Sequence, residues 1–359
     1  MSSEPRPETG APPGDEPTQA RGAAATGIGS MPGEDFAEAV RTVFGELPDL
    51  PHLPELPARG VTAAMPGRTL AVVSELGFDL QPAGWRLTDA SGVDHRRARS
   101  LLAQDLDTLE DLTEGYVGPL KLQLAGPWTL AATVERPRGD RVLGDVGARR
   151  ELAQALALGI GEHVADVRRR VPGASVLVQL DEPALPGVLA GQVPTSSGFH
   201  RHRAVDTPRA SEALEWAFAA VAEAGAESVA HCCAADVPVG LLRGAGAGAV
   251  SVDLAVLAAS AYDDLGTTLD AGQRVLLGVL PAVDPSGSTG RSSGAAAASA
   301  AARAVADRVL RLLDMLGFDP DAVAGRLVLT PACGLAGASP SYARDALRLL
   351  REAARLFPG

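Results

Sequence analysis

The segment Ser228-Val229-Ala230-His231-Cys232-Cys233 decides how the fold of this 359-residue chain is interpreted. Its apolar start is typical of a short buried strand, and metal-binding side chains follow at its carboxyl end. Because side chains alternate along a strand, His231 and Cys233 project to one side and Cys232 projects to the other. The segment therefore predicts a strand that ends in a pair of possible metal ligands.

The only other cysteine of the chain follows a second run of this kind. Cys333 comes shortly after Leu327–Thr330, within Thr330-Pro331-Ala332-Cys333-Gly334-Leu335. One imidazole and two thiolates are donors that select zinc, and an oxygen ligand or a substrate would complete a tetrahedron. A single His or Cys at a strand end is more often a core residue. Three such donors on two strand ends predict a metal site.

Short apolar runs alternate with amphipathic helical patterns from about residue 25 onward. The predicted strands are Thr26–Ser30, Gly60–Ala64, Leu120–Leu124, Val176–Leu180, Ser228–Cys232, Ala249–Leu254, Arg274–Leu280 and Leu327–Thr330. The helical patterns between them include Asp35–Phe44, Asp105–Leu112, Arg149–Arg169, Ala210–Ala224, Ala302–Leu316 and Ser341–Leu356. Eight strands alternating with helices predict an α/β fold closed into a single (β/α)8 TIM barrel over residues 25–359. A doubly wound sheet is the rival, but no Gly-x-Gly-x-x-Gly turn follows the first strand.

Composition argues against several other functions. A net charge of −12 disfavours nucleic acid or an anionic membrane as a partner, and no apolar stretch is long enough to span a bilayer. Residues 1–24 predict a disordered tail without the apolar region of a signal peptide, and residues 285–300 predict a mobile loop. With three cysteines and no export signal, we expect a cytoplasmic protein without a disulfide framework.

Polar residues gather at the carboxyl ends of the predicted strands. They are Ser30, Gln123, Asp181, Glu182, His231, Cys233, Asp253, Asp284 and Cys333. In a barrel these ends share one face, which carries the catalytic groups of this fold. Local alternatives stay open: Asp253 can cap a helix that begins near Leu254, Asp181 and Glu182 can cap the segment around Pro183, and Trp128 can simply pack.

Four motifs occur in a recognisable order: Thr26-Gly27-Ile28-Gly29-Ser30, Gln179-Leu180-Asp181-Glu182-Pro183-Ala184-Leu185, His231-x-Cys233 and Pro331-Ala332-Cys333-Gly334-Leu335. Together they resemble the catalytic barrel of cobalamin-independent methionine synthase, in the uroporphyrinogen decarboxylase/methionine synthase-like superfamily. With room for one barrel, the chain resembles the single-barrel "core" members. The resemblance implies a zinc-dependent methyltransferase that moves a methyl group to the thiol of L-homocysteine and forms methionine.

The resemblance also implies roles for individual residues. Zinc (Zn²⁺) would be held by His231, Cys233 and Cys333, with Asp253 in the place of the family's Glu. The amino-acid part of homocysteine would be held by Ile28, Gly29, Ser30, Asp181 and Glu55, the last two as carboxylates for its ammonium group.

Two departures from the family pattern concern the methyl donor. Thr133 stands where the family has a Trp that stacks on the folate, and Val283 stands where it has a His regarded as the proton donor. No catalytic acid is therefore assigned, and the predicted donor is either methyl-tetrahydrofolate or a methylated corrinoid, the latter on a separate protein. Two other functions stay open. One is a related barrel that methylates another thiol, and the other is a non-catalytic zinc or thiol-redox protein, suggested by the adjacent Cys232 and Cys233.

Overall fold

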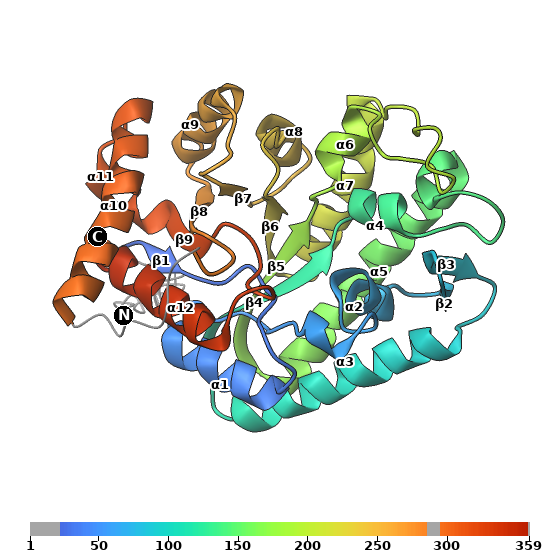
Figure 1. Ribbon diagram of the computed structural model, residues 1–359, viewed down its shortest axis with the longest axis horizontal. Helices are drawn as coiled ribbons and strands as arrows, with labels where there is room; N and C mark the ends of the chain where they lie inside the picture. Colours follow the sequence, from blue (N-terminus) through green and yellow to red (C-terminus); the bar gives the residue numbers. More distant parts are fainter. Residues whose placement is uncertain (1–21, 286–294, 358–359) are drawn as a thin grey trace, which may run out of the picture.

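A curled parallel sheet organises the chain (Figure 1), of which the computed structural model describes residues 22–285 and 295–357. Seven strands lie in the order β1-β9-β8-β7-β6-β5-β4, and all neighbouring pairs are parallel. They are β1 (Ala24–Ala25), β4 (Val117–Ala125), β5 (Gly173–Asp181), β6 (Glu227–Cys232), β7 (Ala249–Asp253), β8 (Arg274–Leu280) and β9 (Leu327–Pro331). An antiparallel pair, β2 (Gly77–Gln81) and β3 (Gly84–Thr88), lies outside this sheet.

Helices connect the strands and lie on the outer side of the sheet (Figure 1). They are α1 (Phe36–Glu46), α2 (Met65–Val72), α3 (Val93–Leu112), α4 (Pro127–Thr133), α5 (Val146–Arg170), α6 (Leu185–Leu189), α7 (Thr207–Glu223), α8 (Val239–Gly244), α9 (Tyr262–Asp270), α10 (Ala295–Leu316), α11 (Pro320–Val323) and α12 (Pro340–Ala354). Side-chain caps start four of them: the side chains of Asp35, Asp145, Asp319 and Ser339 accept from backbone amides in the first turns of α1, α5, α11 and α12. None of the described helices is both long and apolar enough to cross a membrane.

Six of the eight predicted strands are confirmed, with ends that move by a few residues. The predicted strand Gly60–Ala64 is wrong: Gly60 has a φ of 105°, and the chain turns directly into α2, which carries Pro66 in its first turn. The predicted strand Thr26–Ser30 lies too late, because β1 is Ala24–Ala25. Ala24 pairs with Val328, so it does not belong to the predicted tail.

The two edges of the sheet are joined by an irregular segment, Pro51–Glu55. On one side, the Glu55 amide donates to Gly29 O (3.1 Å) in the segment after β1. On the other side, the Leu53 amide donates to Lys121 O in β4 (2.8 Å). Only isolated parallel bridges result, Ser30 with Glu55 and His52 with Lys121. Pro51 and Pro54 lack the amide hydrogens that a continuous ladder needs. The predicted barrel of eight regular strands is therefore observed as seven strands and this segment.

The interior of the curled sheet begins with an apolar layer near the amino ends of its strands. Its members are Leu50, Leu177, Val229, Ala249, Leu276 and Val328, one each from β5 to β9 together with Leu50. Since inward positions recur every second residue, the next inward residues on β5 and β6 are Gln179 and His231. The apolar layer thus fills the bottom of the sheet and leaves its carboxyl ends to polar groups.

Two predicted segments fall partly outside the described residues. The predicted tail lies there up to residue 21, and so do residues 286–294 of the predicted mobile loop. The loop prediction is wrong from Ala295 onward, because α10 begins at that residue. Alanine has the highest helix propensity, and the run of alanines there favours a helix over a loop.

Candidate metal centre

The predicted ligands His231, Cys233 and Cys333 form one group at the carboxyl ends of β6 and β9. Their donor atoms all lie within 4.8 Å of one another. The sulfur atoms of Cys233 and Cys333 are 3.5 Å apart. Cys232, whose side chain points the other way, is fully buried. Burial raises the pKa of the Cys232 thiol to about 12, and a redox couple with Cys333 is not favoured by this arrangement.

The ring of His231 is held by its neighbour on β7. Nδ1 lies 2.9 Å from the hydroxyl oxygen of Ser251, with which it is in register across the β6–β7 pair. Nε2 is buried and has no hydrogen-bond partner among the described residues. In metal-binding histidines, one ring nitrogen usually binds the metal while a neighbouring polar group holds the other. The ring of His231 has this arrangement, with Nδ1 held by Ser251 and Nε2 without a partner in the described chain.

These residues fit zinc. Two thiolates bound to one tetrahedral zinc at about 2.3 Å each lie about 3.8 Å apart, close to the observed separation. A hydrogen bond from the Cys233 thiol lowers the pKa of Cys333 to about 4, while the same bond raises the pKa of Cys233. One thiolate is therefore available at neutral pH, and the unpartnered Nε2 of His231 is a third donor for the same ion.

The three donors open onto a cavity of about 160 Å³. Its wall also contains Ile28, Gly29, Ser30, Glu55, Pro57, Met65, Asp181, Pro183 and Gly334. The structure therefore brings together every predicted binding residue of the amino-acid portion and three of the four predicted metal ligands. Gly334 permits this closeness, because a Cβ at that position would lie 2.1 Å from Ser30 Oγ.

Two buried carboxyl groups face this cavity. Burial raises the pKa of Glu55 to about 7, and Arg68, whose Nε is 3.6 Å from Glu55 Oε1, opposes that rise. Burial also raises the pKa of Asp181 to about 6. A carboxyl group with a raised pKa binds a cation favourably, because the cation stabilises the charged form that burial disfavours.

A polar layer beneath the cavity includes residues to which the sequence assigned no role. Lys121 and Gln123 on β4 and Gln179 on β5 are buried and bonded to one another through Lys121 Nζ. The sequence contains a pattern from which this layer could have been predicted. Lys121 and Gln123 are two residues apart, as are Gln179 and Asp181, so each pair projects to one face of its strand.

Asp181 and Glu182 have opposite surroundings although they are adjacent. Glu182 points to the start of α4, where its carboxylate accepts from the amides of Trp128 (2.9 Å) and Thr129 (2.8 Å) and from the Thr129 hydroxyl (2.7 Å). Glu182 thus caps α4 and not the segment around Pro183, so a cap is observed at a different helix from the predicted one. Trp128 packs, as its simpler interpretation predicts: it is buried, and its Nε1 donates to Ala210 O (2.9 Å).

Three other predicted positions lie outside the group. The Asp253 carboxylate accepts from the Ala255 amide (2.8 Å) and closes a turn, and no described helix begins near Leu254, so the alternative of a helix cap is wrong. The described chain does not place Asp253 among the clustered donors. Thr133 donates back to Thr129 O within α4 (2.8 Å). Val283 is half exposed, in the segment that follows β8.

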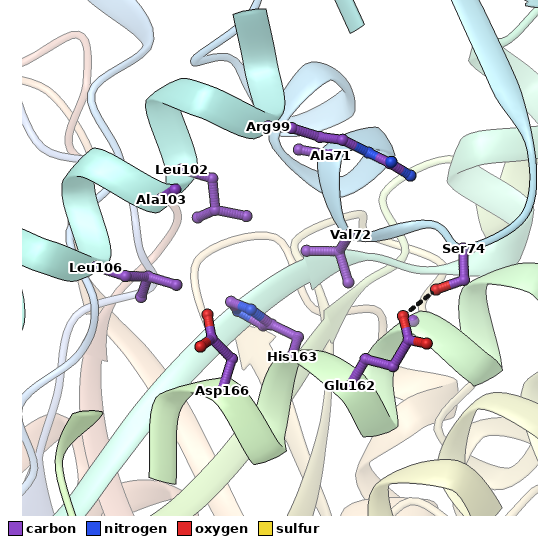
Figure 2. Close-up of a pocket in the computed structure, with 11 residues that line it drawn as sticks. Ala71, Val72, Ser74, Arg99, Leu102, Ala103, Leu106, Glu162, His163 and Asp166 are labelled. Carbon is purple, nitrogen blue, oxygen red and sulfur yellow. Dashed lines mark hydrogen bonds between the residues drawn. The ribbon is translucent and has the colours of Figure 1, made fainter. Parts of the chain in front are cut away.

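A larger cavity of about 340 Å³ lies on the outer side of the sheet, between α2, α3 and α5 (Figure 2). Figure 2 shows the hydrogen bond from Ser74 to Glu162. Asp166 pairs with Arg170 (3.3 Å), and Arg99 donates to Val73 O (3.1 Å). Because its charged groups are satisfied by the protein itself, this cavity is not the candidate site.

The fold and the site define a parallel α/β protein in which two cysteines and a histidine that could hold a metal ion line a cavity at the carboxyl ends of the strands. The family model described as "Cobalamin-independent synthase, Catalytic domain" matches residues 116–356, which is more than half of the chain. The chain therefore belongs to this family, and the resemblance seen in its motifs is confirmed.

Comparisons with other proteins agree at the level of fold. The structure of a B12-independent methionine synthase from Shewanella sp. W3-18-1, in complex with selenomethionine, is similar with a TM-score of 0.55 and 14% identity over 93% of this chain and 97% of that chain. Oxaloacetate acetylhydrolase in complex with the product oxalate gives a TM-score of 0.37 and 11% identity over 89% and 78%, too low to support an argument. A search of curated protein sequences finds no match. A methylated corrinoid as donor conflicts with membership of a cobalamin-independent family. The corrinoid alternative in the donor prediction is therefore not supported.

Proposed function

We propose that this chain transfers the methyl group of methyl-tetrahydrofolate to the thiol of L-homocysteine and forms methionine. One observation carries the proposal: His231, Cys233 and Cys333 open onto the same small cavity as two buried carboxyl groups, Glu55 and Asp181. The first set suits a thiol-binding zinc ion, and the second set suits an ammonium group. A cavity of about 160 Å³ has room for a small amino acid.

The residues of the site have three proposed roles: they bind the metal, orient its histidine ligand and bind the ammonium group of the substrate. Zinc bound by His231, Cys233 and Cys333 would lower the pKa of the substrate thiol and so supply a thiolate nucleophile. Ser251 fixes the ring of His231 through Nδ1, and Nε2 would be the atom that binds the ion. Glu55 and Asp181 would hold the ammonium group, so that the sulfur is fixed relative to the methyl carbon. Asp253 stays the proposed fourth ligand before substrate binds, which would require it to release the Ala255 amide.

We also interpret the sheet as an eight-position barrel in which Pro51–Glu55 takes the place of the second strand. This interpretation is supported by its hydrogen bonds to the segment after β1 and to β4. It explains how Glu55 reaches the face that carries the carboxyl ends of the strands.

The test is an assay of methionine formation by zinc-loaded protein with L-homocysteine and methyl-tetrahydrofolate, read by mass spectrometry. Homocysteine lacking its amino group serves as a matched acceptor, since it keeps the thiol but cannot use Glu55 and Asp181. Methionine from homocysteine and little product from the desamino thiol support the proposal. A protein that binds no zinc and makes no methionine contradicts it, and equal turnover of both thiols favours the alternative of a methyltransferase for another thiol.

A further inference from the structure

One lysine lies at the centre of the polar layer beneath the cavity. Lys121 is the only lysine of the chain and is fully buried. Its Nζ has three acceptors: Ile28 O at 2.9 Å, Gln123 Oε1 at 3.0 Å and Gln179 Oε1 at 2.8 Å. An ammonium group has three donors and no acceptor, so this arrangement uses each of its protons.

Arginine would not serve at this position, although every other Lys or Arg position of the chain is an arginine. Arg68, for example, makes a buried ion pair with Asp105 at 2.9 Å. A guanidinium group is planar and spreads its donors over a wide fork, whereas the three acceptors around Lys121 converge on one atom. The lysine therefore meets a requirement for a compact donor.

The ammonium group also determines which way the Gln179 amide faces. Because Oε1 accepts from Lys121, Nε2 is directed to Ile28 O (2.9 Å) and to Asp181 Oδ1 (2.7 Å). Without the ammonium group, the buried Oε1 would lose its donor, and the Gln179 side chain would be held only at its nitrogen end. Ile28 O receives a donor from Lys121 and another from Gln179, so the backbone before Gly29 and Ser30 is held twice.

We propose that Lys121 is a positioning residue for the amino-acid subsite: its ammonium group orients the Gln179 amide, which holds both Asp181 and the Ile28–Ser30 segment at the wall of the cavity. This inference rests on the proposed function, because it takes the subsite to be that of homocysteine. Lys121 contacts neither the cavity nor the clustered sulfur atoms. Its effect on the substrate is therefore indirect.

The first test is kinetic. Lys121→Met keeps most of the side-chain length but removes the ammonium group. We expect the KM for homocysteine to rise by about 10-fold to 100-fold while kcat changes by less than about threefold. Bound zinc should stay at the wild-type level. Arg170→Met is the control, since it removes a mostly buried cation that pairs with Asp166 (3.3 Å) on α5, away from Gln179 and the Ile28–Ser30 segment, and its KM should change by less than about threefold.

The second test uses the single lysine as a probe and needs no turnover. In wild-type protein labelled with ¹⁵N-lysine, the one side-chain ammonium signal should exchange slowly with water and should shift when L-homocysteine is added to the zinc-loaded protein. In Lys121→Met, the backbone amide signals of Gly29, Ser30 and Asp181 should move.

The outcomes separate the two proposals. A wild-type protein that neither binds nor methylates homocysteine contradicts the proposed function. Unchanged amide signals of Gly29, Ser30 and Asp181 in Lys121→Met overturn the positioning role, whatever the activity. If that variant does not fold, a wild-type lysine signal that exchanges as fast as that of free lysine overturns it instead.

Discussion

Two of the cavities in the described chain differ in a way that size does not reveal. The cavity between α2, α3 and α5 is about 340 Å³, and the cavity at the metal centre is about 160 Å³. In the larger one, Glu162, Asp166 and Arg99 are each bonded to other protein groups. In the smaller one, the buried Nε2 of His231 has no partner and two carboxyl groups have raised pKa values.

Groups that a ligand could satisfy therefore mark the site better than volume does only when they line one space, because single unpartnered atoms such as the ring nitrogens of His52 also occur elsewhere in the described chain. A buried polar atom without a partner costs free energy, and a protein that keeps several of them around one space gains from a ligand that satisfies them. The larger cavity is also lined by the buried ring of His163, whose nitrogen atoms are not among the buried polar atoms that lack a partner in the described chain. That single neutral group does not define a ligand.

The largest effect is expected from the metal centre itself. Cys333→Ser should lose bound zinc and lower methionine formation by about 1000-fold or more, because a thiolate ligand is removed. Cys232→Ala is the matched control: the residue is the same type, next to Cys233, and packed away from the cavity. Its zinc content, measured by mass spectrometry of the metal, should equal that of the wild type. Equal zinc in Cys333→Ser would show that the cluster is not the metal site.

A smaller effect, on the KM for homocysteine, is expected when one carboxylate is neutralised in each of the two cavities. Asp181→Asn keeps the oxygen that accepts from Gln179 but removes the charge for the ammonium group. The KM for homocysteine should rise by about 30-fold to 100-fold, as for a lost charged hydrogen bond. Glu162→Gln changes a carboxylate of the larger cavity and should leave KM unchanged. A comparable rise in both variants would contradict the separation of the two cavities.

Most of the parallel sheet could be predicted from the sequence because its strands are buried on both faces and appear as short apolar runs. The failures have local causes. Pro51–Glu55 makes strand-like hydrogen bonds without an apolar run, because its prolines interrupt the ladder. Gly60–Ala64 has the apolar content of a strand, but the positive φ of Gly60 leads it into a helix.

The candidate site was predictable to the extent that it depends on strand alternation. His231, Cys233 and Asp181 follow that rule, and the structure places all three at one cavity. The environment of Glu182 was not predictable, since it depends on where the start of α4 lies in space. Neither was the position of Lys121 at the centre of its network, because its three acceptors come from β4, from β5 and from the segment after β1.

The smallest effect is a pH dependence of stability that has opposite signs in the two cavities. The pKa of Glu55 is raised from 4.5 to about 7, mainly by burial, so the folded chain binds more protons than the unfolded chain between these values. Its contribution to stability is complete below pH 4.5 and is lost as the pH rises through about 7. The pKa of His163 is lowered from 6.5 to about 4, again mainly by burial, so its contribution is complete above pH 6.5 and is lost as the pH falls through about 4.

Two variants separate these contributions. In metal-free protein, urea unfolding of Glu55→Gln should show a smaller loss of stability than the wild type from about pH 5 to pH 7, where the raised pKa values of Asp181 and Glu182 still contribute. His163→Gln should show a smaller gain than the wild type from about pH 4 to pH 6. Each difference should be no more than about 3 kcal/mol, since one pKa unit corresponds to about 1.4 kcal/mol. Metal-free protein is needed because zinc binding releases protons in the same range. If the two variants changed the pH dependence in the same direction, the buried groups of the two cavities would not differ in the way that their surroundings indicate.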